Sequence, residues 1–243
     1  MQPRALIVIP ARMGSSRFPG KPLASIAGVT MLERVWSIGK AVGNASQVVI
    51  ATDHVDIEQH AKSFGAEVVM TSAACRTGTD RVAEVATKLA DSFDIVFSFQ
   101  GDSALTPPWV IEETLAEMLA DPSVQIATPA VALRGEALER FVSEKARGST
   151  TGTTVVFSKT RNALYFSKAL LPNRRDKADG LPPVFLHIGL YGYRSEVLQR
   201  FAMLPQGALE EVEQLEQLRA LEHDIPIRVV VVDTRGRTLC SVD

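Results

Sequence analysis

Short apolar runs rich in β-branched residues alternate with helical patterns through the first half of the sequence, and this alternation most limits the possible fold. The runs at 5–9 and 47–51 are almost wholly apolar, which is typical of parallel strands covered by helices on both faces. The pattern therefore predicts an α/β, Rossmann-like fold with a mostly parallel central sheet and helices on both faces. The predicted strands are 5–10, 47–52, 66–70, 94–99 and 125–131, and the predicted helices are 30–42, 55–63, 79–90 and 108–120.

The regular alternation weakens after residue 131. A polar stretch at 134–154 is followed by predicted strands at 153–158 and 163–167 and by a charged, Pro-rich loop at 172–183. The α/β pattern then returns with a strand at 186–193, helices near 194–203 and 208–222, and a strand at 227–232. We therefore expect a single domain over residues 1–243, in which residues 134–185 form a small inserted subdomain. A chain of 243 residues can bury enough apolar surface to fold as one such domain.

Composition excludes several classes of protein. The net charge of −2 gives no general attraction to nucleic acid or to membranes. Two cysteines are too few for a disulfide framework, and neither has metal-ligand spacing. No apolar run approaches the roughly 20 residues of a membrane span, and the N-terminal region lacks the pattern of a cleavable leader. We expect a cytoplasmic protein without nucleic-acid partners or membrane insertion.

The loop after the first predicted strand combines positive charge with turn residues. Arg12, Arg17 and Lys21 lie in it with two glycines and two serines, whereas the first carboxylate of the chain is Glu33. Cations and backbone N–H groups together bind phosphates, so the loop predicts a site for an anionic ligand. The alternative is a solvated basic loop with a Pro-Gly turn.

Two common phosphate motifs do not fit this loop. Five residues rather than four separate Gly14 from Gly20, and Pro22 occupies the place of the Ser or Thr of a P-loop. The Gly-x-Gly-x-x-Gly pattern of dinucleotide-binding proteins does not follow the first strand either.

Loops 10–22, 52–54 and 100–106 follow predicted parallel strands, and ligands of open α/β sheets bind at such carboxyl ends. In the third loop, Asp102 follows a buried strand. A carboxylate that faces a phosphate loop suits Mg²⁺, which takes one or two carboxylates together with phosphate oxygens and water. A simple turn role is the alternative for Asp102. The run Thr77-Gly78-Thr79-Asp80-Arg81 opens a predicted helix, for which capping by Thr79 or Asp80 is a sufficient structural explanation.

Residues 10–23, Pro-Ala-Arg-Met-Gly-Ser-Ser-Arg-Phe-Pro-Gly-Lys-Pro-Leu, match every fixed position of the opening pattern of 3-deoxy-manno-octulosonate cytidylyltransferases. The chain resembles this family along most of its length. The resemblance implies a nucleotidyltransferase fold, Mg²⁺ as cofactor, CTP and an acidic sugar as substrates, and a homodimer formed through 134–185. The implied reaction makes a CMP-sugar and pyrophosphate for lipopolysaccharide or capsule synthesis. Another sugar or cofactor nucleotidyltransferase, and a catalytically weak nucleotide-binding homologue, are the alternatives.

The same resemblance implies the site residues. Catalytic roles fall to Arg12, Lys21 and Asp102, and metal binding to Asp102 and Asp243. The residues expected to bind the nucleotide are Ala11, Arg12, Ser15, Ser16, Arg17, Lys21, Thr77, Gly78, Arg81 and Gln100. Motifs at 165–168, 187–191 and 215–219 imply a sugar pocket formed by Gln100, Lys168, His187, Tyr191, Glu216 and Gln217. By itself, His187 would be read as a satisfied core histidine and Glu216 as a solvated helix residue.

The chain departs from the family pattern at several positions. Ser103 and Ala104 replace the usual Glu-Pro, Lys168 replaces an Arg, and Cys75 replaces a His and is given no role. The changes at Ser103, Ala104 and Lys168 favour either a modified 3-deoxy-octulosonate, such as an amino-substituted one, or another nonulosonate-like acid. The family pattern continues beyond the position of Asp243, so a naturally short protein and an incomplete sequence are both open.

Overall fold

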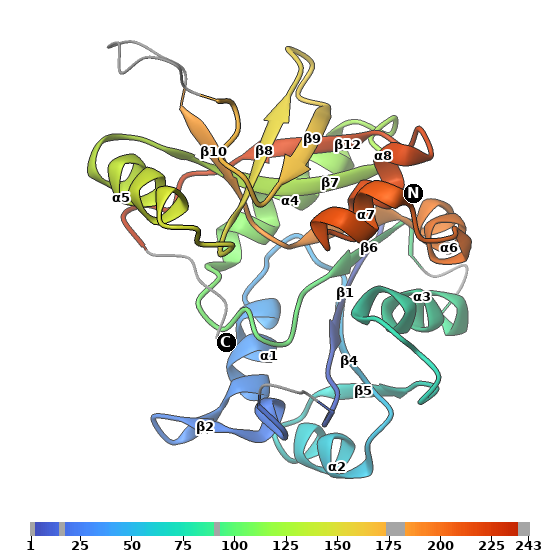
Figure 1. The fold of residues 1–243 in the computed structure, drawn as a ribbon. Helices are drawn as coiled ribbons and strands as arrows, with labels where there is room; N and C mark the ends of the chain where they lie inside the picture. Colours follow the sequence, from blue (N-terminus) through green and yellow to red (C-terminus); the bar gives the residue numbers. More distant parts are fainter. Residues whose placement is uncertain (1–2, 15–17, 90–92, 174–182, 238–243) are drawn as a thin grey trace.

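The computed structural model describes residues 3–14, 18–89, 93–173 and 183–237, which form a large twisted sheet with helices against it (Figure 1). The strands of the main sheet are β1 (Ala5–Pro10), β4 (Gln47–Thr52), β5 (Glu67–Met70), β6 (Ile95–Ser98), β7 (Ile126–Leu133), β8 (Thr153–Phe157), β9 (Ala163–Ser167), β10 (Val184–His187), β11 (Tyr191–Arg194) and β12 (Ile227–Val231). The helices are α1 (Met31–Lys40), α2 (Val55–Ser63), α3 (Gly78–Lys88), α4 (Pro108–Ala120), α5 (Gly135–Ala146), α6 (Ser195–Met203), α7 (Ala208–Glu213) and α8 (Leu218–Glu222). A 3-10 turn, η1 (Lys21–Leu23), and a small hairpin of β2 (Ser25–Ile26) and β3 (Val29–Thr30) follow the first loop.

The sheet has the order β5-β4-β1-β6-β11-β7-β10-β8-β9, with β12 on β7. The prediction of an α/β fold is confirmed, but the prediction of a mostly parallel sheet is wrong. Strands β5, β4, β1 and β6 pair parallel with one another in that order, and β12 pairs parallel with β7. Strands β8 to β11 pair antiparallel with their neighbours, which makes the sheet mixed.

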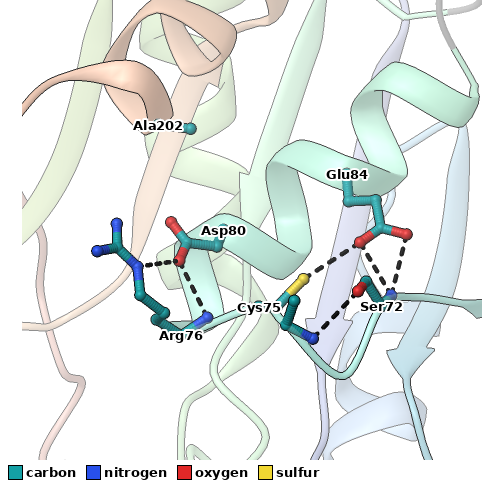
Figure 2. A pocket seen from close by; sticks show the side chains of 7 residues that line it. Ser72, Cys75, Arg76, Asp80, Glu84 and Ala202 are labelled. Atoms are coloured by element: carbon teal, nitrogen blue, oxygen red, sulfur yellow. Dashed lines mark hydrogen bonds and ion pairs between the residues drawn. The ribbon is translucent and has the colours of Figure 1, made fainter.

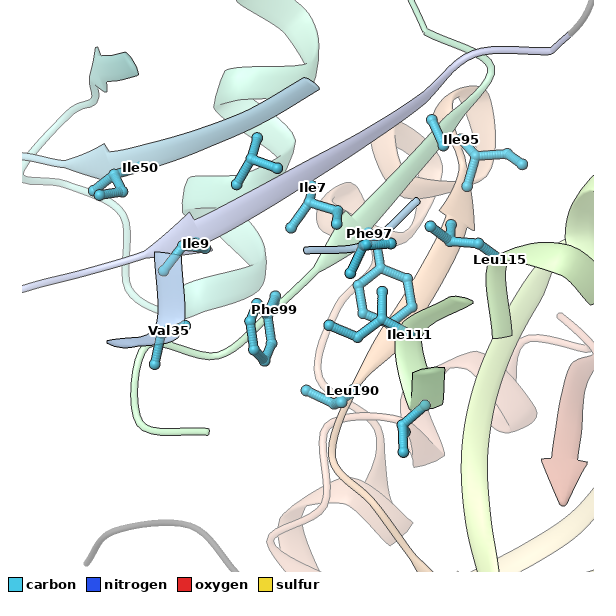
Figure 3. Close-up of a cluster of buried hydrophobic side chains, with 14 of the residues drawn as sticks. Ile7, Ile9, Val35, Ile50, Ile95, Phe97, Phe99, Ile111, Leu115 and Leu190 are labelled. Atoms are coloured by element: carbon cyan, nitrogen blue, oxygen red, sulfur yellow. The ribbon is translucent and has the colours of Figure 1, made fainter. Parts of the chain in front are cut away.

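Alternate residues of β1 face two different cores, which explains why this strand is apolar throughout. Ile7 and Ile9 lie in the core covered by α1, α2 and α4, where Phe97 and Phe99 also pack (Figure 3). Leu6 and Val8 lie in the second core, under α3, α6 and α8. The central strands are therefore packed on both faces up to the point where they end in the loops of the site.

Three predicted elements differ from the structure. The predicted strand 186–193 is two strands, because the chain shifts register against β7: His187 lies opposite Ala130, but Gly192 lies opposite Ala127. The predicted helix 208–222 is interrupted after α7, where Gln214 adopts a φ of 54°. The polar stretch 134–154 contains α5, which buries little besides Phe141 and so has a weak apolar signal.

Residues 134–185, predicted as an insertion, supply α5, β8, β9 and the start of β10. Through the pairing of β10 with β7, these strands continue the main sheet. Within the described residues, every helix is too short or too polar to span a bilayer.

Candidate active site

The ends of β1 and β6 and the start of α3 enclose a cavity of about 210 Å³. Most residues that were expected to bind the nucleotide line this cavity, although they come from three separate segments. Its lining includes Ala11, Arg12, Lys21, Thr77, Gly78, Arg81, Gln100 and Asp102. Ser15, Ser16, Arg17 and Asp243 lie outside the described residues, so their predicted roles stay predictions.

Gly101 lets the loop 100–106 approach the loop 10–22 closely. A Cβ at Gly101 would lie 2.8 Å from the carbonyl oxygen of Pro10, which is too close for a side chain. Only glycine therefore lets the end of β6 approach the end of β1 this closely. This approach places Asp102, the next residue, at the cavity beside the loop that carries Lys21.

Lys21 and Asp102 form an ion pair in the cavity. Lys21 Nζ lies 3.1 Å from Asp102 Oδ2, and the Lys21 side chain is only 13% exposed. A turn at Gly20, with a φ of 72°, leads into η1 and directs Lys21 to this position. The site thus brings together a cation that can neutralise a phosphate and a carboxylate that can bind a metal.

The surroundings of Asp102 fit a metal that arrives with its phosphates. The Asp102 side chain is 38% exposed, so its carboxylate is accessible from the cavity. Within the described part of the chain, no group of three or more His, Cys, Asp or Glu residues could hold a metal by itself. A single carboxylate suits Mg²⁺, which takes further ligands from phosphate oxygens and water.

Arg81 reaches the cavity from α3, and two residues that the sequence analysis did not identify hold it there. Its guanidinium lies 3.2 Å from Asp53 Oδ2 and donates to the Thr71 hydroxyl. Arg81 is 3% exposed, so the Asp53 carboxylate compensates its charge away from water. The sequence signal for Asp53 was its position directly after β4, in the loop 52–54 that was expected at the ligand site.

Thr77 and Asp80 cap α3 together, so the expected capping role of Asp80 is confirmed, whereas Thr79, the other expected residue, does not take part. The Thr77 side chain accepts from the backbone N–H of Asp80, and Asp80 accepts in return from the N–H of Thr77. Capping therefore needs Thr77 and Asp80, and it leaves the Thr79 hydroxyl available for another contact. Thr79 donates to Glu216 Oε2, with the two oxygens 2.5 Å apart.

Cys75 lines this cavity and also a second one of about 330 Å³ (Figure 2). In the second cavity Glu84 accepts from the Cys75 thiol and from the N–H of Ser72, while Asp80 belongs to the helix cap. Burial and the nearby Glu84 raise the pKa of the Cys75 thiol to about 11. The thiol is therefore neutral, and the polar groups of the second cavity already serve local structure.

His187 is half-buried among aromatic rings. Its Nε2 lies 2.8 Å from the Thr128 hydroxyl, and its ring contacts Phe166 and Tyr191 with centroids 4.9 and 5.5 Å away. Burial lowers the pKa of His187 to about 3. The ring is neutral near pH 7, so it offers hydrogen bonds and contact area rather than charge.

Glu216 and Gln217 lie in the linker between α7 and α8, not in one continuous helix. Burial raises the pKa of Glu216, which is therefore not the solvated residue that its spacing allowed. Glu216 Oε1 and Gln217 Nε2 are buried and have no hydrogen-bond partner within the described structure. Such atoms cost free energy unless a ligand or water satisfies them.

Lys168 follows β9 directly, and its contacts differ from those of the other predicted sugar residues. Its backbone N–H donates to Glu213 Oε2 at 3.0 Å, and its carbonyl accepts from Lys145 Nζ at 2.5 Å. Burial and the nearby Lys168 lower the pKa of Lys145. Two cations therefore lie near each other at the end of β9.

Comparison with known proteins shows the family of the chain. The family model described as Cytidylyltransferase matches residues 6–227. A 3-deoxy-manno-octulosonate cytidylyltransferase of Maricaulis maris is 52% identical over 238 residues, which cover 98% of this chain and 92% of the relative. The chain belongs to the 3-deoxy-manno-octulosonate cytidylyltransferase family.

Two further relatives of this nucleotidyltransferase family bear on the ligands. An 8-amino-3,8-dideoxy-manno-octulosonate cytidylyltransferase of Shewanella pealeana is 42% identical, over 93% of this chain and 89% of the relative. A solved structure of CMP:2-keto-3-deoxy-manno-octonic acid synthetase complexed with CTP matches with a TM-score of 0.84 and 37% identity, covering 94% of this chain and 90% of that one.

The loop that departs from the family pattern is ordered without the usual Glu-Pro. The N–H of Ser103 donates to the Gln100 carbonyl at 3.0 Å, and the Ser103 carbonyl accepts from Thr106 at 3.1 Å. Ala104 packs against the core formed by α1, α2 and α4. Backbone hydrogen bonds thus hold the turn that presents Asp102 in this family member.

We expect the low pKa of His187 to make the free energy of unfolding depend on pH. Below pH 6.5 the unfolded chain binds a proton that His187 in the folded protein does not bind, so stability falls as the pH drops toward 3. Between pH 7 and pH 5, wild type should lose roughly 2 kcal/mol more free energy of unfolding than His187→Gln, which cannot titrate. Urea unfolding at both pH values measures this difference, and equal losses in the two proteins would contradict a neutral His187.

Proposed function

We propose that the chain transfers the cytidylyl group of CTP to 3-deoxy-manno-octulosonate, releasing pyrophosphate. The observation that carries the proposal is the Lys21–Asp102 pair at 3.1 Å in a cavity that Arg12, Thr77 and Gln100 also line. This arrangement supplies cations for a triphosphate and a carboxylate for a metal. Family membership supports the choice of base and sugar, and the product would serve lipopolysaccharide or capsule synthesis.

The proposed reaction is an in-line displacement. The anomeric 2-hydroxyl of the sugar forms a bond to the α-phosphorus of CTP, the bond from that phosphorus to the bridging oxygen breaks, and the hydroxyl proton passes to solvent. Negative charge builds on the pyrophosphate as it leaves. Arg12 and Lys21 stabilise that charge, since preorganised cations are the main contribution of proteins to phosphoryl transfer.

Mg²⁺ is the proposed cofactor. Asp102 would hold it together with phosphate oxygens, and Asp243 is the proposed second protein ligand. When bound, the ion neutralises phosphate charge and lowers the pKa of a coordinated hydroxyl. Lys21 would then exchange its contact with Asp102 for the phosphates, so the pair seen here keeps both groups at the site before the ligand arrives.

The sugar would bind beside the nucleotide, toward β11 and the α7–α8 linker. Tyr191 lies opposite Ser98 in the sheet, and the Ser98 hydroxyl accepts from Gln100 Nε2 at 3.2 Å. This connection supports a sugar pocket that begins at Gln100 and continues over Tyr191, His187, Glu216 and Gln217. Lys168 would provide positive charge for the sugar carboxylate.

The residues that depart from the family pattern favour an alternative acidic sugar. Ser103, Ala104 and Lys168 replace usual family residues, and one relative carries the name of an 8-amino sugar enzyme. We therefore keep 8-amino-3,8-dideoxy-manno-octulosonate as the alternative substrate. We further propose a homodimer formed through residues 134–185 and a location in the cytoplasm.

Pyrophosphate release tests the function. Purified protein is assayed with Mg²⁺, each of the four nucleoside triphosphates, and a panel of acidic sugars that includes both octulosonates. The expected result is release with CTP and one octulosonate only. Failure with every acidic sugar, combined with retained CTP binding, would contradict the enzyme and favour a nucleotide-binding module.

A further inference from the structure

Thr79 connects the two halves of the proposed site. It is the second residue of α3 and is 5% exposed, and its hydroxyl donates to Glu216 Oε2 at 2.5 Å. The two residues lie 137 positions apart in the chain. Thr77 and Gly78, directly before Thr79, line the nucleotide cavity, whereas Glu216 belongs to the proposed sugar side.

The Glu216 carboxylate depends on this contact for its position. Arg219 lies 3.7 Å from Glu216 Oε1, but Arg219 donates to Glu210 through Nε at 2.7 Å and Nη2 at 2.6 Å. The Thr79 hydroxyl therefore holds Oε2 of Glu216, while Oε1 is buried and has no hydrogen-bond partner in the described structure.

We propose that Thr79 is a positioning residue that couples nucleotide binding to sugar binding. Glu216, held by Thr79, presents Oε1 to a hydroxyl of the acidic sugar. This role rests on the proposed function. A nucleotide that contacts Thr77 and Gly78 restrains the first turn of α3, and the Thr79 contact passes that restraint to Glu216. Because coupling is reciprocal, CTP strengthens sugar binding and the sugar strengthens CTP binding by the same factor.

Paired substitutions test the hydroxyl itself. Thr79→Val keeps the shape of the side chain and removes the donor, and Thr79→Ser restores the donor. We expect Thr79→Val to raise KM for the acidic sugar roughly tenfold, as for a lost hydrogen bond to a carboxylate, with KM for CTP changed less than about twofold. Thr79→Ser should recover most of the wild-type value.

The matched control lies on the same helix, away from the site. Thr87 donates to the Ala83 carbonyl at 3.0 Å and to Gln199 at the same distance. Thr87→Val should leave both KM values unchanged. In a Glu216→Gln background, Thr79→Val should cost much less than in wild type, because its partner is already altered.

Calorimetry measures the coupling directly. The sugar acid is titrated into protein with and without a CTP analogue whose α and β phosphorus atoms are joined by a methylene group. Wild type should bind the sugar more tightly with the analogue present, and Thr79→Val should lose most of that gain.

The outcomes separate the two proposals. If wild type releases no pyrophosphate with any acidic sugar, the proposed function fails, and the role of Thr79 fails with it. If wild type is active and Thr79→Val leaves the sugar KM and the coupling unchanged, the Thr79 proposal alone is overturned. Equal losses for both substrates together with a lower Tm, not recovered by Thr79→Ser, would show a merely structural role and also overturn it.

Discussion

Asp102→Asn is expected to lower kcat roughly 1000-fold in the pyrophosphate assay, an effect of the size seen when a transition-state contact is removed. The amide keeps the shape of the side chain but loses the charge that pairs with Lys21 at 3.1 Å and that would hold Mg²⁺. Binding of CTP measured in the absence of magnesium should be retained, since Arg12 and Lys21 are unchanged.

A surface aspartate provides the control for Asp102. The Asp56 side chain is 61% exposed on α2, so Asp56→Asn should leave kcat unchanged. A kcat for Asp102→Asn within about threefold of wild type would contradict any role of this carboxylate in catalysis.

Arg219→Met is expected to lower the free energy of unfolding by about 3–5 kcal/mol, the usual cost of leaving one member of a buried ion pair alone. The side chains of Arg219 and Glu210 are 7% and 8% exposed, and two hydrogen bonds join them. Methionine fills similar space but leaves the Glu210 carboxylate buried without its partner. Urea denaturation monitored by circular dichroism measures the loss.

Two variants make the Arg219 result specific to the buried charge. The double variant Arg219→Met with Glu210→Leu removes both charges and should recover most of the stability. Lys62→Met breaks a surface ion pair with Glu58. The Lys62 side chain is 61% exposed, so the loss should cost less than about 1 kcal/mol. A loss below about 1 kcal/mol for Arg219→Met would contradict the importance of the buried pair.

The first half of the fold was predictable because its signals are local. Strands β1 and β4 are apolar throughout, since each has helices on both faces, and the predicted bounds 5–10 and 47–52 are confirmed. The three strand-end loops were also expected to meet, and residues from 10–22 and 100–106 share the cavity. Parallel strands end at one edge of the sheet, which makes this meeting a consequence of the fold.

The second half of the fold was less predictable because the hydrophobic periodicity of a strand does not specify which strands it pairs with. Strands β10 and β11 look like one apolar run, but a register shift against β7 and their pairing with different second neighbours, β8 and β6, separate them. Helix α5 was missed because it buries little besides Phe141, so its sequence looks like a polar connection.

By itself, the sequence determined the α/β class and the family from which the phosphate, nucleotide, sugar and metal roles are proposed. These conclusions depend on residue types and spacings within about 15 positions. Only the tertiary structure decided that Asp53 holds Arg81, that Thr79 holds Glu216, and that Arg219 pairs with Glu210 in a buried site. Such contacts form when packed elements exclude water and bring buried charges and their partners together from distant parts of the chain, which residue types and spacing alone do not specify.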